Sequence, residues 1–130
     1  MKRLLQIVLV SSLSLLCFSC YYDELPEEID PIDLPDDVVV SFKDNVQPLF
    51  MGTDKDCTAC HDGIDANPDL REGNSYNAIV PQYVTAGNAE NSELYNKLPG
   101  IGHPFDVGFV LSGDEIAVIK AWIDRGAENN

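Results

Sequence analysis

The sequence predicts an all-α domain preceded by a non-globular N-terminal segment. Apolar residues recur with helical spacing in three stretches, residues 42–50, 88–98 and 112–126. No stretch shows the alternation of a half-buried strand, and the only β-like run, residues 38–40, is too short to form one. A chain of 130 residues accommodates one domain. We therefore expect one helical domain over residues 38–130.

The first predicted helix covers residues 42–50. Four apolar residues recur at the spacing of one helix face: Phe42, Val46, Leu49 and Phe50. Ser41 or Asp44 can cap its N-terminus. Pro48 lies inside the pattern and should kink or loosen the last turn, because proline lacks the N–H that the helix requires.

The middle of the domain alternates loops and short helices. Residues 62–74 are rich in Gly, Asp and Asn and predict a loop. Residues 75–80 predict a short helix that Pro81 stops. A further helix is expected over residues 88–98, capped by Asn88 and ended by Pro99 and Gly100. Its inward residues would be Leu94, Tyr95 and Leu98.

The last helix carries the clearest signals. Ser112 and Glu115 have the spacing of a capping box, and Gly126 suits a left-handed C-terminal stop after Arg125. Its apolar stripe comprises Ile116, Ile119 and Ile123, widened by Val118 and Trp122. The larger aromatic residues are interpreted as core residues without a redox role: Phe42, Phe50, Tyr95, Phe109 and Trp122.

The N-terminus has the organisation of an export signal. Lys2 and Arg3 precede an apolar run, residues 4–16, that is too short to span a bilayer. Ser19-Cys20 then resembles the lipobox of bacterial lipoproteins, although Cys17 departs from the usual Leu or Val. The resemblance implies a signal peptide over residues 1–19, a lipid on Cys20, and an exported protein held at a membrane, the outer membrane, facing the periplasm or the surface. An ordinary cleavable signal peptide is the alternative.

Residues 20–37 are expected to form a disordered tether between Cys20 and the domain. After Cys20, this segment contains eight acidic residues and three prolines and no basic residue, so like-charge repulsion and proline favour an extended chain. Its acidic start also resembles the surface-export signals of some lipoproteins. The full chain has a net charge of −14, which becomes −16 after loss of Lys2 and Arg3. This acidity argues against nucleic acid as a partner.

The motif Cys57-Thr58-Ala59-Cys60-His61 is the most informative stretch of the chain. C-x-x-C-H is the attachment signature of a c-type haem, in which two thiols bond to the porphyrin and the histidine binds the iron. The cysteine inventory agrees, because Cys17 leaves with the signal, Cys20 takes the lipid, and Cys57 and Cys60 take the haem. Covalent haem would also supply an apolar core to a domain without disulfides.

Six segments in order around this motif carry a family resemblance: residues 42–50, 57–61, 78–81, 87–98, 111–116 and 122–127. The chain resembles class I, single-haem c-type cytochrome domains, nearest to the planctomycete-type cytochrome c domains, over most of residues 41–127. The resemblance implies a small helical cytochrome c-like fold around one covalent haem. Members of this family usually have Met-Pro before the last helix, where this chain has His103-Pro104. We therefore expect His61 and His103 as the two iron ligands; an open site or ligation by Met51 are the alternatives.

Three classes of function remain to be distinguished. The first is a non-enzymatic electron carrier whose acidic surface favours redox partners with basic docking patches. The second is a haem sensor or a peroxidase-like haem protein, in which an open iron site binds peroxide, NO or CO. The third is a zinc module formed by Cys57, Cys60, His61 and His103, although the adjacency of Cys60 and His61 makes tetrahedral closure awkward. A thioredoxin-like role is disfavoured because no βαβ pattern surrounds the cysteine pair.

Overall fold

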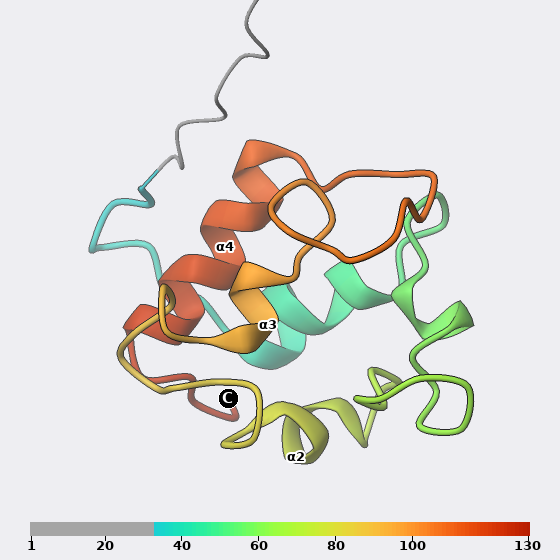
Figure 1. The fold of residues 1–130 in the computed structure, drawn as a ribbon. Helices are drawn as coiled ribbons and strands as arrows, with labels where there is room; N and C mark the ends of the chain where they lie inside the picture. Colours follow the sequence, from blue (N-terminus) through green and yellow to red (C-terminus); the bar gives the residue numbers. More distant parts are fainter. Residues whose placement is uncertain (1–32) are drawn as a thin grey trace, which may run out of the picture.

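The computed structural model describes residues 33–130, and this part of the chain is helical (Figure 1). The elements in order are η2 (Phe42–Val46), η3 (Gln47–Phe50), η4 (Cys57–Ala59), α2 (Ser75–Ile79), α3 (Glu93–Asn96) and α4 (Gly113–Asp124). Residues 33–130 contain no β-strand, only an isolated bridge between Met51 and Asp56. The all-α prediction is confirmed. The predicted signal peptide, Cys20 and residues 20–32 of the tether lie outside the described residues.

The first predicted helix is present as two short, differently wound helices. The π-helix η2 begins after Ser41, whose hydroxyl accepts a hydrogen bond from the Asp44 N–H at 3.2 Å. The 3₁₀ helix η3 follows directly, with Pro48 in its first turn. Proline is tolerated there because the first N–H groups of a helix have no partner within the helix. The change in winding therefore occurs where proline was expected to disturb the helix.

An aromatic cluster joins three helices that are distant in the sequence. The ring centroid of Phe42 in η2 lies 5.0 Å from that of Trp122 in α4 and 5.2 Å from that of Tyr76 in α2. Trp122 is buried, and its indole N–H donates to the carbonyl of Glu128 at 2.9 Å. Of the five aromatic residues interpreted as core, four are buried; Phe109 is only half-buried, in the loop before α4. Its interpretation as a core residue was wrong.

Helix α4 begins and ends at the residues that the sequence indicated. The Ser112 hydroxyl accepts from the Glu115 N–H at 3.3 Å, and the Glu115 carboxylate accepts from the Ser112 N–H at 2.7 Å. Gly126 has a φ of 109°, a conformation that favours glycine. The predicted stripe is buried at Ile116, Ile119 and Ile123. Helix α4 is the longest element of the described chain, and η2 and α3 pack against it.

The helix predicted over residues 88–98 is much shorter. Helix α3 begins only at Glu93, because the side chains before it form loop contacts instead. The Asn88 side chain accepts from the Asn91 N–H at 3.1 Å, and the buried Ser92 hydroxyl donates to the Asn88 carbonyl at 2.8 Å. Such local side-chain bonds compete with helix formation. The short helix α2 before Pro81 is confirmed, and residues 62–74 form a loop as predicted.

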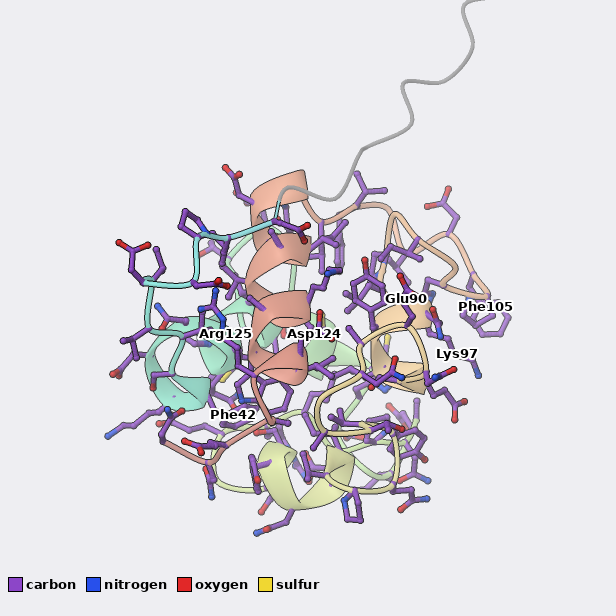
Figure 2. The ribbon with its side chains drawn as sticks, turned by 90° about the vertical axis from the view of Figure 1, so that its left-hand side faces the viewer. Phe42, Glu90, Lys97, Phe105, Asp124 and Arg125 are labelled. Atoms are coloured by element: carbon purple, nitrogen blue, oxygen red, sulfur yellow. The ribbon has the colours of Figure 1, made fainter. Side chains whose placement is uncertain are left out.

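Residues 33–38 lie against α4, where Arg125 binds them. The Arg125 guanidinium donates to the backbone carbonyls of Leu34 at 3.1 Å, of Pro35 at 2.9 Å, and of Val38. Lys120 pairs with Asp33 at 3.1 Å, and Leu34 packs against the core. In Figure 2, this segment runs beside α4, with Arg125 between them. The packed chain thus includes the last residues of the predicted tether, before the domain start expected at residue 38.

Candidate functional site

Cys57 begins the 3₁₀ helix η4, Cys60 caps its C-terminal end, and His61 follows directly. The turn is capped by Asp56, whose carboxylate accepts from the backbone N–H of Thr58 at 2.9 Å. The carbonyl of Cys57 accepts from the N–H groups of both Cys60, at 3.3 Å, and His61, at 2.9 Å. The turn therefore brings the backbone of Cys60 and of His61 close to that of Cys57.

The two thiols are free and differ in their burial. Cys57 is half-buried against the core, whereas Cys60 is exposed. Burial raises the pKa of the Cys57 thiol to about 11, and the nearby Asp56 carboxylate adds to this shift. The thiol therefore stays protonated at neutral pH. Thiol–disulfide oxidoreductases depend on a cysteine with a lowered pKa, so Cys57 lacks the character that this chemistry requires.

The fold brings His61 and His103 together from distant parts of the sequence. Their ring centroids are 6.4 Å apart and their planes are nearly perpendicular, at 84°. Two imidazoles that bind one metal ion from opposite sides have centroids about 6 Å apart, since each metal–nitrogen bond is about 2 Å long and each nitrogen lies about 1 Å from its ring centre. The observed separation of the two rings matches this arrangement.

The ring nitrogens of both histidines fit a role as metal ligands. Nδ1 of His61 is buried and has no hydrogen-bond partner among the described residues. An unpaired buried nitrogen of this kind costs about 1–3 kcal/mol. Nδ1 of His103 lies 2.9 Å from the carbonyl oxygen of Phe105. This contact is a hydrogen bond only if Nδ1 is protonated, which in a neutral ring leaves the Nε2 lone pair free for a metal.

Met51, the alternative ligand, is engaged by a neighbour. Its sulfur accepts a hydrogen bond from the side-chain amide of Gln47 at 3.4 Å. Gln47 is itself buried and donates to the carbonyl of Leu70 at 3.1 Å. These contacts connect η3 with the loop that follows His61. The Met51 sulfur therefore already has a hydrogen-bond partner in the structure.

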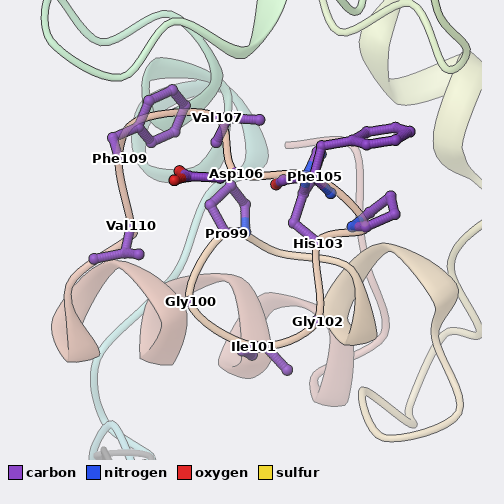
Figure 3. A pocket seen from close by; sticks show the side chains of 11 residues that line it. Pro99, Gly100, Ile101, Gly102, His103, Phe105, Asp106, Val107, Phe109 and Val110 are labelled. Carbon is purple, nitrogen blue, oxygen red and sulfur yellow. The ribbon is translucent and has the colours of Figure 1, made fainter.

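The loop of residues 99–110 carries His103 and surrounds a hollow of about 320 Å³ (Figure 3). Four large apolar side chains of this loop are exposed: Ile101 (43 %), Phe105 (75 %), Val107 (37 %) and Val110 (59 %). Exposed apolar side chains gathered in one place mark a binding surface. The sequence analysis did not single out these residues; apolar residues concentrated in a Gly/Pro-containing loop are the signal that would have found them.

The segment after His61 is held in a defined conformation. The Leu70 N–H donates to the His61 carbonyl at 2.9 Å, which closes the loop between them. Within it, the Asp62 carboxylate accepts from the N–H groups of Ile64 and Asp65, both at 2.8 Å. The hydrogen bonds from Asp65 and Ile64 lower the pKa of Asp62. Asp62 therefore shapes the loop beside His61.

The described residues offer little support for a zinc site. No group of three or more His, Cys, Asp or Glu side chains gathers closely enough within residues 33–130 to hold a metal ion. Structural zinc sites use four such ligands. Over the same range, no helix has the length and apolar character needed to cross a membrane.

Comparisons with known proteins identify no relative. No protein-family model, no curated protein and no solved structure matches this chain.

Proposed function

We propose that this protein binds one covalent haem c and transfers electrons, held at a membrane by a lipid on Cys20. One observation carries the proposal: the fold places the ring of His103 6.4 Å from that of His61, the residue that completes the C-x-x-C-H motif. The motif and His103 together match the chemistry of haem c, which needs two thiols for thioether bonds and imidazoles for the iron. The small helical cytochrome c-like fold is part of the proposal.

Each residue of the site has a separate task in this proposal. Cys57 and Cys60 would hold the porphyrin by thioethers, and His61 and His103 would be the axial ligands. Haem c, when bound, supplies a one-electron Fe(III)/Fe(II) couple. With Nδ1 of His103 protonated, the Phe105 carbonyl would accept its hydrogen and leave Nε2 free for the iron. A histidine in place of the more usual methionine lowers the reduction potential, because a methionine ligand raises it.

The acidity of the chain suits basic redox partners. The net charge of −14 attracts proteins with basic docking patches and accelerates their encounter. Salt screens such attraction over about 8–10 Å at moderate ionic strength, so the rate of electron transfer to a basic partner should fall as salt rises.

To test for covalent haem, we would purify the protein after export from cells that contain the haem-attachment machinery. We expect the mass of one haem in addition to the polypeptide, and a pyridine haemochrome spectrum typical of two thioether bonds. The variant carrying both Cys57→Ser and Cys60→Ser should lack the haem. Ala59→Ser, which alters the same turn but keeps both thiols, should retain it. Exported parent chain without haem would overturn the proposal, and zinc in its place would revive the zinc module.

The second axial ligand is tested by absorption spectroscopy and by carbon monoxide. With His103 bound, the oxidised protein lacks the weak long-wavelength band of a Met–iron(III) bond, and CO binds slowly to the reduced protein. His103→Ala should open the site and accelerate CO binding, whereas Met51→Leu should change neither property. A Met–iron(III) band in the parent would refute His103. Fast, complete CO binding to the parent would favour the sensor or peroxidase-like alternative.

A further inference from the structure

Gly102 occupies a tight contact between the His103 loop and the end of α3. A Cβ atom on this residue would lie 2.5 Å from the backbone carbonyl oxygen of Asn96. This distance is shorter than side-chain carbons adopt, and the obstacle is backbone rather than a flexible side chain. Gly102 is not among the glycines with positive φ. Space, and not backbone conformation, is therefore the reason that glycine is required here.

The Asn96 carbonyl cannot retreat easily from an added methyl group. Tyr95, which precedes it, and Leu98, two residues after it, are buried, whereas Lys97 between Asn96 and Leu98 is exposed. The Asn96 side chain also donates to the carbonyl of Glu90 at 2.7 Å. On the loop side, the Gly102 N–H donates to the carbonyl of Leu98 at 3.2 Å. A methyl group at residue 102 would therefore displace the loop and not the helix.

The residue that follows this contact is His103, as Figure 3 shows. We propose that Gly102 is a positioning residue: its close approach to α3 holds the His103 ring opposite His61. The inference rests on the proposed haem-binding function and adds to it. The Phe105 carbonyl orients the ring of His103, and the Gly102 contact determines where its backbone lies. These two contacts together hold His103 in position before any metal binds.

The test compares the haem-bearing Gly102→Ala variant with the parent. We expect the variant to keep its covalent haem by mass and to lose the His103 bond. Its spectrum should change from six-coordinate low-spin to high-spin, and added imidazole should restore the low-spin form. CO should bind about tenfold more tightly or better, which corresponds to ~1.4 kcal/mol of lost His103 ligation. Combining Gly102→Ala with His103→Ala should give the spectrum of His103→Ala alone, because Gly102 acts through His103.

Two glycines serve as matched controls. Gly108→Ala adds a methyl group to the same loop at a strained φ of 81°, but nothing lies within 4 Å of the new Cβ. Gly52→Ala adds one outside the loop, with only ordinary contacts to Lys55 at 3.6 Å and beyond. Both variants should keep the spectrum of the parent. A Gly108→Ala spectrum that changes as much as that of Gly102→Ala would overturn the specific role of Gly102.

A second variant covers the case in which Gly102→Ala yields no haem-bearing protein. One glycine inserted between Gly102 and His103 leaves the Asn96 contact intact and uncouples His103 from it. This variant should also become high-spin and bind CO more tightly. A low-spin spectrum like that of the parent, in Gly102→Ala or in the insertion variant, would overturn the inference while the haem-binding function stands. A parent without haem, or with an open iron site, would overturn the inference together with the proposed function or its His103 ligand.

Discussion

The Glu115→Gln substitution tests how strongly the Lys55–Glu115 ion pair holds the segment before Cys57 to α4. The Glu115 carboxylate accepts from the Lys55 ammonium at 2.6 Å and from the Ser112 N–H at 2.7 Å. Glutamine also serves at this position of a capping box, so the substitution removes the charge and little else. The pair is partly shielded, with 31 % and 27 % of the two side chains exposed. An ion pair of this kind contributes about 0.5–1 kcal/mol, and a negative charge in the first helical turn about 0.3–1 kcal/mol.

We therefore expect Glu115→Gln to lower the free energy of unfolding by about 1 kcal/mol, measured by urea unfolding at neutral pH. Glu93→Gln is the matched control, because Glu93 pairs with Lys97 at the same 2.6 Å but with 56 % and 49 % of the side chains exposed. An exposed pair of this type should contribute less than about 0.5 kcal/mol. Equal losses in the two variants would contradict the reasoning that partial burial strengthens the Lys55–Glu115 pair.

The same pair should make stability depend on pH. Partial burial works to raise the pKa of Glu115, but the hydrogen bonds from Lys55 and Ser112 outweigh it and lower the pKa. The unfolded chain, with a glutamate pKa of about 4.3, therefore takes up the proton first as the pH falls. The stabilisation is complete above about pH 4.3 and disappears as the pH falls through the lower pKa of the folded state. The difference between parent and Glu115→Gln should shrink in acid; a constant difference would refute the ionic origin.

Three further substitutions test the fold and the site. Phe42→Ala should lower the free energy of unfolding by about 3–5 kcal/mol, because Phe42 is buried against Trp122; a thermal or urea transition near that of the parent would contradict this packing. Met51→Leu should leave the absorption spectrum of the haem protein unchanged, and a spectral shift would mean that Met51 reaches the iron. Arg125→Gln should accelerate amide hydrogen exchange in residues 33–38 by about tenfold, since charged hydrogen bonds contribute over 1 kcal/mol; unchanged exchange would show that other contacts hold this segment.

Local signals predicted the ends of α4 because they act within a few residues. The Ser112–Glu115 capping box and the stop at Gly126 involve only neighbouring backbone groups. The prediction that a helix begins at residue 88 was wrong, because nothing in the sequence indicated that Ser92 would be buried. In the structure, Ser92 is buried and bonded to Thr85 and Asn88, an arrangement that depends on how the loop folds back. The apolar pattern of residues 88–98 therefore marked burial correctly and helix length wrongly.

The features of the candidate site also divide into those that the local sequence indicated and those that depend on the tertiary fold. The Cys57–His61 motif was recognisable in the sequence because its members are neighbours, and the backbone turn that joins them also involves only neighbouring residues. The apolar rim around His103 was not predicted, because exposure of Phe105 depends on the path of a whole loop. Phe109 was assigned to the core for the same reason, since an apolar residue outside a helical pattern carries no directional information.

The sequence by itself determined the helical class and the boundaries of α4, and it contains the Cys57–His61 motif on which the haem proposal rests. Only the tertiary structure decided that His103 faces His61, that Gly102 lies against the Asn96 carbonyl, and that Arg125 holds residues 33–38 on α4. The physical reason is the separation along the chain over which each kind of interaction acts. Capping and turn formation act between neighbours in the chain, whereas these three contacts join distant segments whose approach is determined by packing of the whole core.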